Sequence, residues 1–517
     1  MIRHRGESRF RRSWIAAVVV VVVAGAFGSV ARDAAAVSPY AQVGVGAPPV
    51  TSVDQLPDVA APTTTSGGGP IPVMGASTST SVVVAGPTTT DPPTILPSVV
   101  STSIGVASTV SSSLVVSSSA VPTTTQGSGV VTTRPPATSV DELRTRVSAL
   151  LAGSTASRMG VFVVVDGDGP VLFERNADRG LVPASTQKIY VAGAALSTMG
   201  PDARFITEVL ADGAIAGGVL SGDLVLHASG DPTFSATQLT SLASSVRSTG
   251  VSRVSGSLVL DDARYDRVLR VGSWKPSFTP GESGWLSAFS VDGNHRNDAA
   301  TLADPALANL ERFRAALGAT GITVSGASRR GVASPSAVAV GVSRSQPLQD
   351  IVRSLVKRSD NTYAELLTKE LGARLGSGST ANGVTAIANY FAQLKVSRPE
   401  TQEDGSGLSS NNRSSPRTQV VYLQRALASP IGAVLRSSFA VSCVDGTLRS
   451  RTCGTAASGK VLAKSGAIDN VVALSGVTTT ASGRPVTFSF LMNGVRSPRL
   501  GRSAIDAVLV EVVRSTV

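Results

Sequence analysis

The stretch Pro183-Ala184-Ser185-Thr186-Gln187-Lys188, followed by an apolar run over residues 189–196, decides how this chain is interpreted. A proline and a serine at this point are typical of a helix start, and the apolar run predicts that the helix is buried. On a helix, Ser185 and Lys188 share a face because they lie three residues apart, so their side chains can touch. The helix N-terminus also favours negative charge at Ser185.

This spacing suits a serine nucleophile. A serine hydroxyl reacts poorly until a neighbouring base takes its proton. Lys188 can be that base only if burial or a nearby cation keeps it partly neutral, because the pKa of free lysine is about 10.4. A simpler interpretation makes Ser185 a helix cap and Lys188 a surface charge, but it does not explain the apolar helix that follows.

A second motif, Ser359-Asp360-Asn361, falls between two helical patterns. A polar triplet at such a junction is ordinarily a turn with a cap. As a catalytic element, Ser359 would pass a proton towards the leaving group and the Asn361 amide would hold a substrate carbonyl. The flanking apolar stripes are Leu348, Ile351, Val352, Leu355 and Val356 before it, and Tyr363, Leu366, Leu367 and Leu371 after it.

A third motif, Lys464-Ser465-Gly466, begins or ends a predicted strand over residues 460–467. Lys464 would supply positive charge for a terminal carboxylate, and Ser465 a hydroxyl for the same group. Gly466 would remove a side chain where the substrate approaches the strand. Lys464 is also the candidate cation beside Lys188. Each motif alone is weak evidence for a catalytic site; K-S-G, for example, is a common surface turn. The three motifs in this order are harder to produce by chance.

With these motifs in this order, the chain resembles the class C low-molecular-mass penicillin-binding proteins, the D-alanyl-D-alanine carboxypeptidase/endopeptidase family that trims peptidoglycan. The resemblance runs from about Val140 to the C-terminus. One departure is Ser465, where the family usually has Thr; the hydroxyl is retained, so we expect activity to persist. Other segments similar to the family are 229–234 (S-G-D-P-T-F), 304–326 and 404–409 (D-G-S-G-L-S).

The resemblance implies roles for the first two motifs. Ser185 would be the nucleophile and Lys188 its general base. Ser359 and Asn361 would serve proton transfer and substrate positioning, with Asp360 contributing to substrate binding. The reaction would acylate Ser185 with the penultimate D-Ala of a stem peptide, release the terminal group and end with hydrolysis by water.

The resemblance also implies a carboxylate pocket and an oxyanion hole. Lys464, Ser465 and Gly466 would line the pocket for the D-Ala carboxylate. The backbone N–H groups of Ser185 and Ala467 would form the oxyanion hole, in which each donor typically contributes about 3 kcal/mol. A β-lactam would imitate the substrate and stop after acylation. No cofactor or metal is implied.

Composition argues against several other classes. Only His4, His227 and His295 are available, and neither of the last two has a second histidine at metal-ligand spacing. The net charge of +11 invites a nucleic-acid interpretation, but we expect no nucleic-acid partner because 4% aromatic residues and the absence of a known motif argue against one. Anionic wall polymers, lipid headgroups or no partner at all remain open for this charge.

The two cysteines, Cys443 and Cys453, are predicted to form a disulfide rather than remain free thiols, because they lie close together in an exported region. The bond would rigidify the segment before Lys464.

The N-terminus predicts export. Five arginines precede an apolar run over residues 14–31, and positive residues stay cytoplasmic. Residues 1–36 are therefore a signal peptide or a membrane anchor, and both remain open, so the protein is membrane-anchored or secreted into the cell wall. Residues 37–138, rich in Ser, Thr and Pro, predict a disordered linker.

The remaining sequence predicts an α/β (α+β) fold, a β-lactamase/transpeptidase-like antiparallel sheet flanked by helices. Ser139 and Glu142 form a predicted capping box, and Asp166-Gly167-Asp168-Gly169 a hairpin turn. Because 174 positions separate Ser185 from Ser359, a strand-rich inserted module is placed at 205–335 between the first and second motifs. The peptidase domain then comprises 139–204 and 336–517, closed by a C-terminal helix over 503–513.

Two competing functions remain at this point. A β-lactamase would share the three motifs but would deacylate quickly, and a non-catalytic wall-binding or penicillin-sensing protein would keep the fold without turnover. Within the peptidase interpretation, the balance between carboxypeptidase and cross-link endopeptidase activity stays open.

Overall fold

The computed structural model describes residues 134–517. The predicted signal peptide or anchor and nearly all of the predicted linker lie outside the described residues. Within 134–517, none of the helices has the length and apolar character needed to cross a membrane.

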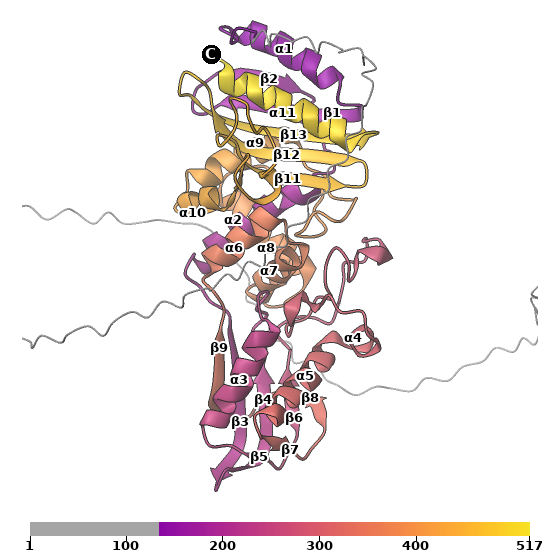
Figure 1. The fold of residues 1–517 in the computed structure, drawn as a ribbon, viewed down its shortest axis with the longest axis vertical. Helices are drawn as coiled ribbons and strands as arrows, with labels where there is room; N and C mark the ends of the chain where they lie inside the picture. The colour runs from indigo at the N-terminus through magenta and orange to yellow at the C-terminus, as the bar shows by residue number, and fades with distance from the viewer. Residues whose placement is uncertain (1–133) are drawn as a thin grey trace, which may run out of the picture. The chain divides into compact units, whose positions relative to one another are not determined.

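Helices and strands alternate along the described chain (Figure 1). The helices are α1 (Val140–Ala152), η1 (Ala184–Gln187), α2 (Lys188–Met199), α3 (Ala236–Ser248), η2 (Pro276–Phe278), η3 (Asp292–Asn294), α4 (Ala299–Ala303), α5 (Pro305–Ala319), α6 (Leu348–Arg358), α7 (Asn361–Ala373), α8 (Thr380–Gln393), α9 (Pro416–Leu427), α10 (Gly432–Ser438), η4 (Gly446–Leu448) and α11 (Pro498–Arg514). The strands are β1 (Ala156–Val165), β2 (Val171–Arg175), β3 (Ile206–Ala216), β4 (Val219–His227), β5 (Arg253–Val254), β6 (Leu258–Asp261), β7 (Thr323–Val324), β8 (Ser328–Arg330), β9 (Val338–Arg344), β10 (Ala440–Val441), β11 (Leu462–Ile468), β12 (Val471–Thr479) and β13 (Pro485–Val495).

The main sheet has six antiparallel strands in the order β10-β11-β12-β13-β1-β2. Helices α1 and α11 pack against each other and against this sheet, and α9 packs against β1, β12 and β13 (Figure 1). Strands β12 and β13 are buried along almost their whole length, and their sequences are mostly apolar with a few buried Ser, Thr and Asn residues. The predicted fold class, an antiparallel sheet flanked by helices, is confirmed.

Helix α2 lies inside the molecule. Its residues from Lys188 to Leu196 are all buried, and it packs against α6, α7 and α8. A helix that is hydrophobic on every side is a core helix, as the apolar run after Lys188 predicts. Ser185 precedes α2 in the short 3₁₀ turn η1, whose N-cap position is Pro183, so Ser185 is not the helix cap.

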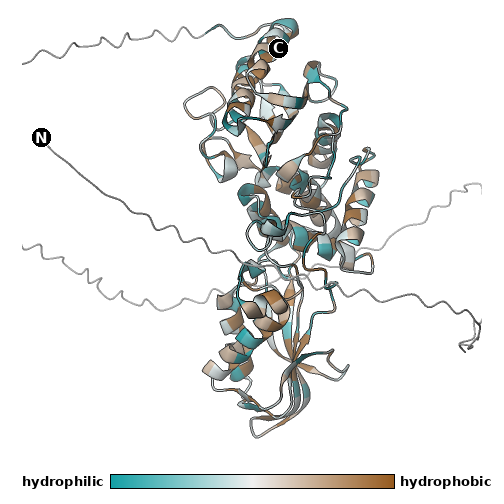
Figure 2. Ribbon diagram, turned by 90° about the vertical axis from the view of Figure 1, so that its right-hand side faces the viewer, coloured by the Kyte–Doolittle hydropathy of each residue, from teal (hydrophilic) through white to brown (hydrophobic). Residues whose placement is uncertain are grey.

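A second sheet, of seven strands, lies between α2 and α6 in the sequence. Its main path is β7-β5-β4-β3-β9, and β6 and β8 extend it from β4. Hydrophobic residues, brown in Figure 2, recur along the helices and strands of this part as well. Because β9 pairs with β3 in antiparallel register, the sheet continues to Arg344, beyond the module boundary predicted at residue 335.

The described residues before Ser139 already pack on the peptidase part of the chain. Ala137 is fully buried, and its carbonyl accepts the N–H of Thr516 at 3.0 Å. Ser139 caps α1 by accepting the N–H of Glu142, whereas the Glu142 carboxylate accepts the N–H of Thr138 instead of that of Ser139. Only half of the predicted capping box therefore forms.

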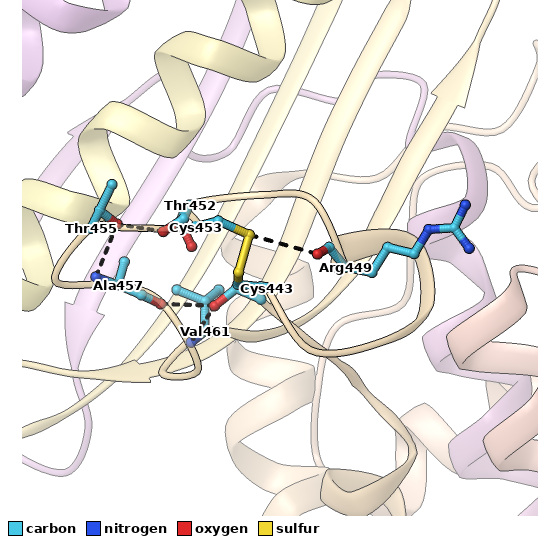
Figure 3. The surroundings of a disulfide bond; sticks show 8 residues. Cys443, Arg449, Thr452, Cys453, Thr455, Ala457 and Val461 are labelled. Carbon is cyan, nitrogen blue, oxygen red and sulfur yellow. Dashed lines mark hydrogen bonds between the residues drawn. A yellow bond between two sulfur atoms is a disulfide. The ribbon is translucent and has the colours of Figure 1, made fainter. Parts of the chain in front are cut away.

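Cys443 and Cys453 are joined by a disulfide (Figure 3). The bond closes a loop that contains η4, and Leu448 at the end of η4 is buried in the core. The sulfur of Cys453 also lies 3.7 Å from the carbonyl oxygen of Arg449 inside the loop. The segment before β11 is thus closed covalently and anchored by an apolar side chain.

We expect replacement of both cysteines by serine to lower the free energy of unfolding by about 3 kcal/mol, because the unfolded chain regains the entropy that the short loop removes. Urea unfolding followed by circular dichroism measures the difference. The parent protein in reducing agent is the control and should match the double variant. Equal stability of oxidised parent and variant would contradict this assignment.

Candidate active site

The amino group of Lys188 lies at the centre of the site, and its side chain is fully buried. Its Nζ donates to Ser185 Oγ at 3.0 Å, to Asn361 Oδ1 at 2.6 Å and to the carbonyl of Ser406 at 2.6 Å. A buried amino group needs such partners, because removing a polar group from water is costly unless it is hydrogen-bonded. The surface-charge interpretation of Lys188 is therefore wrong.

Burial lowers the pKa of Lys188 to about 8, although the carboxylates of Asp404, Glu365, Asp360 and Glu282 oppose this shift. Desolvation disfavours the charged form of a lysine. Burial, rather than the predicted cation Lys464, is thus the main cause of the lowered pKa. At mildly alkaline pH a large fraction of Lys188 is neutral and able to accept a proton.

The second motif joins α6 to α7. Ser359 ends α6 in the left-handed region, with φ of 63°, and its hydroxyl accepts a hydrogen bond from Lys464 Nζ at 2.8 Å. Asn361 is the first residue of α7, and its amide reaches Lys188. Asp360 caps α7 by accepting the N–H of Tyr363 at 2.9 Å. The substrate-binding role predicted for Asp360 stays a prediction.

The third motif lies in the interior of β11 rather than at its start or end. Lys464 is fully buried, and its Nζ also donates to the carbonyl of Ser465 at 2.7 Å. Burial, together with the charge of Lys188, lowers the pKa of Lys464 well below its usual value. Ser465 donates to the hydroxyl of Thr447 at 2.7 Å.

The nucleophile turn packs directly on β11. A Cβ on Gly466 would lie 2.9 Å from the carbonyl oxygen of Pro183 and 3.2 Å from Cβ of Ala184. Gly407, at φ +84°, has a similar role, because its Cβ would lie 2.0 Å from the carbonyl oxygen of Ala184. The glycine at 466 therefore makes room for the chain before Ser185; its predicted role in substrate approach stays a prediction.

Residues from the first two motifs meet at one cleft of about 640 Å³, together with Ala467, which directly follows the third motif on β11; Lys464, Ser465 and Gly466 are not among the described residues that line it. Ser185, Ser359, Asn361 and Ala467 line it, so the predicted nucleophile and the predicted second oxyanion donor face the same space. The other lining residues are Phe278, Glu282, Leu408, Ile468, Asp469, Val471, Pro498 and Arg502. The segment between the second sheet's strands β6 and β7 thus supplies part of the wall through Phe278 and Glu282.

The D-G-S-G-L-S segment is organised by Asp404, whose side chain is fully buried. One carboxylate oxygen accepts the N–H of Gly407 at 2.9 Å. The other accepts the N–H of Ser409 at 2.7 Å and the indole N–H of Trp274 at 2.9 Å. These bonds shape the loop that presents the Ser406 carbonyl to Lys188.

Glu365 is a site residue that the sequence analysis missed. It is fully buried, and its Oε1 accepts the N–H groups of Gly405 at 3.0 Å and Ser406 at 2.7 Å. Its Oε2 has no hydrogen-bond partner within residues 134–517, and burial raises its pKa to about 8. The spacing held a signal, since Glu365 lies four residues after Asn361 and so on the same helix face.

Of the two histidines of the described chain, only His295 comes near the second motif, with its Nε2 3.3 Å from Oγ1 of Thr362. His227 contacts Asp261 at 2.8 Å, and this hydrogen bond raises its pKa. His295 lies 2.6 Å from the carbonyl oxygen of Pro280. Neither lines the cleft that contains Ser185.

Known proteins are similar to this chain in sequence and in fold. Residues 143–281 and 285–512 match the D-Ala-D-Ala carboxypeptidase 3 (S13) family. The D-alanyl-D-alanine carboxypeptidase of Actinomadura sp. is 30% identical over 441 residues, covering 69% of this chain and 82% of the relative. The crystal structure of penicillin-binding protein 4 from Haemophilus influenzae superposes with a TM-score of 0.63 at 22% identity, covering 69% of this chain and 98% of that one. Its complex with a β-lactam gives a TM-score of 0.58 at 22% identity, covering 70% and 98%. The matched family spans both sheets and all three motifs, and the chain therefore belongs to the D-Ala-D-Ala carboxypeptidase 3 (S13) family.

Proposed function

We propose that this chain is a serine D,D-peptidase that hydrolyses the D-Ala-D-Ala terminus of peptidoglycan stem peptides through an acyl-enzyme on Ser185. The observation that carries the proposal is the fully buried Lys188, whose Nζ lies 3.0 Å from Ser185 Oγ. Membership of the S13 family supports the substrate, as does the relative from Actinomadura sp. named a D-alanyl-D-alanine carboxypeptidase.

In the acylation half, neutral Lys188 accepts the proton of Ser185 as Oγ bonds to the carbonyl carbon of the penultimate D-Ala. The N–H groups of Ser185 and Ala467 stabilise the negative charge that develops on the carbonyl oxygen. The carbon–nitrogen bond then breaks, and a proton passes through Ser359 to the leaving amine. Ser359 is suited to this step because its hydroxyl contacts Lys464 Nζ at 2.8 Å.

In the deacylation half, a water molecule attacks the ester carbon, and Ser185 recovers its proton as the carbon–oxygen bond breaks. Lys464 and Ser465 hold the terminal carboxylate of the substrate during acylation. A β-lactam enters the same first half, and its ring nitrogen stays attached to the acyl group after the bond opens, so water is kept out. The same chemistry applies to a D-Ala cross-link, whose leaving amine belongs to a neighbouring stem.

We expect a fluorescent penicillin to label the purified protein stably, and Ser185→Ala to abolish the label because no hydroxyl remains to be acylated. Gel fluorescence measures the label, and release of D-Ala from a pentapeptide or from cross-linked muropeptides measures turnover. Ser437→Ala, at an exposed serine on α10, is the matched control and should label like the parent.

Two results would contradict the proposal that this chain is a D,D-peptidase. Rapid loss of the label from the parent would indicate a β-lactamase, and a folded parent without label would indicate a non-catalytic wall-binding or penicillin-sensing protein.

We expect the acylation rate to rise with pH through about 8 and then level off, because Lys188 is protonated below its pKa and accepts a proton only above it. Glu365→Gln should move the midpoint modestly to lower pH, since Glu365 is itself only partly ionised near pH 8 and its ionised form raises the pKa of Lys188. The amide oxygen can still accept from Gly405 and Ser406. Stopped-flow acylation by a penicillin between about pH 6 and about pH 10 measures both profiles.

Glu311→Gln is the control for Glu365→Gln, because Glu311 is an exposed carboxylate on α5. Its profile should match that of the parent. A parent rate that does not change over this pH range would exclude Lys188 as the base.

We also propose that the protein is exported and acts in the cell wall. Arginines before the apolar run at residues 14–31 support this topology, since positive residues stay cytoplasmic. Residues 1–36 serve as a cleaved signal peptide or as a membrane anchor. The Ser/Thr/Pro-rich segment that follows would let the peptidase domain reach substrate at a distance from the membrane.

Deletion of residues 47–130 should leave hydrolysis of a soluble peptide unchanged and reduce activity on intact cells, because the tether becomes too short. Activity assays on peptide and on cells, with fractionation of the labelled protein, measure this. A scrambled linker of the same composition is the control and should behave like the parent. Loss of both activities in the deletion would show that the segment is needed for folding.

A further inference from the structure

The hydroxyl of Ser465 has one side-chain partner, the hydroxyl of Thr447. The mechanism above gives Thr447 no role. Ser465 Oγ lies 2.7 Å from Oγ1 of Thr447, which belongs to η4. Serine lacks the γ-methyl group that restricts χ1 of threonine, so a serine hydroxyl has more freedom to rotate. The contact with Thr447 therefore fixes the direction of a hydroxyl that would otherwise be free.

Thr447 is exposed, but the residues on both sides of it are anchored. On one side of it, Leu448 is buried in the core. On the other, Gly446 packs so closely on the C-terminal end of α6 that a Cβ would lie 2.7 Å from the carbonyl oxygen of Lys357. Asp445 forms an ion pair with Lys357 and accepts the N–H of Val441 at 2.9 Å.

The disulfide between Cys443 and Cys453 closes this loop (Figure 3). The loop therefore connects α6, which ends next to Ser359, with the strand that carries Lys464 and Ser465. Groups that must bind a ligand in one geometry benefit from such support, because a side chain locked by its surroundings loses less freedom on binding.

We propose that Thr447 is a positioning residue for the terminal carboxylate of the substrate. When the carboxylate binds, the Ser465 hydroxyl donates to it, and the Thr447 hydroxyl turns to donate to Ser465 Oγ. Each hydroxyl has one donor and two acceptor sites, so both bonds can form at once. A chain of hydrogen bonds polarises its members, which strengthens the bond to the carboxylate. This inference rests on the proposed function.

The position of the pair makes its effect selective. Lys464 lies on the same strand, and its Nζ donates to the carbonyl of Ser465. The Thr447–Ser465 pair adds a hydroxyl of fixed direction close to that amino group. It should matter for ligands that carry the terminal carboxylate and not for acyl donors that lack it.

The test is Thr447→Val in the full chain, which keeps the shape of the side chain and removes its hydroxyl. With a peptide ending in D-Ala-D-Ala we expect KM to rise about tenfold and kcat to change less than about twofold, since a hydrogen bond to a charged group is weakened. With an N-acyl-D-alanyl thioester whose leaving group has no carboxylate, both constants should stay within about twofold of the parent.

Three further variants isolate the hydroxyl. Thr447→Ser keeps the donor and should retain the parent KM. Adding Ser465→Thr to Thr447→Val should restore most of the affinity, because the γ-methyl group then restricts the rotamer. Thr452→Val removes a hydroxyl from the same loop that has no hydrogen-bond partner within residues 134–517, and it should match the parent. Thermal unfolding confirms that each variant is folded.

The outcomes separate this inference from the function on which it rests. An unchanged KM for Thr447→Val in an active enzyme overturns the inference alone, and so does an equal loss on both substrates, which marks a general disturbance of the loop. A parent that neither hydrolyses D-Ala-D-Ala nor is labelled by penicillin overturns the proposed function, and the inference with it.

Discussion

The burial of one amino group, that of Lys188, is the constraint on which the rest of the site depends. The side chain is fully buried, so its Nζ must find partners inside the protein. It finds three, on Ser185, Asn361 and the Ser406 carbonyl. They come from η1, from the start of α7 and from the loop organised by Asp404. The same burial lowers the pKa of the lysine. Burial thus accounts both for the hydrogen bonds of Nζ and for its ability to accept a proton.

Close backbone packing then places the serine. The chain before Ser185 lies against β11 and against the D-G-S-G-L-S loop. It passes so close to Gly466 and Gly407 that a Cβ at either position would collide with it. Two buried carboxylates, Asp404 and Glu365, hold that loop through its backbone N–H groups. The indole of Trp274 adds a bond from the region of the second sheet. The segment inserted between the first two motifs thus contributes to the wall and to the support of the cleft.

Several elements were predictable because their signals are local. The apolar run after Lys188 predicted a core helix, and the stripes around residues 359–361 predicted α6 and α7, since helical periodicity is visible over a few turns. The end of the second sheet was not predictable, because β9 is defined by its pairing with β3, more than a hundred residues earlier. Glu365 was overlooked although its spacing from Asn361 places both on one helix face.

The sequence by itself determined the three motifs, their order, the family to which they point and the cysteine pair, because each of these is a matter of residue type and spacing along the chain. The tertiary structure alone decided the charge state and the geometry. Burial of Lys188 depends on residues from α2, α7 and the loop at 404–409, and the contact between Ser465 and Thr447 joins a strand to a disulfide-closed loop. The desolvation that lowers the pKa of Lys188 arises only when segments distant in the sequence pack together and exclude water from its amino group.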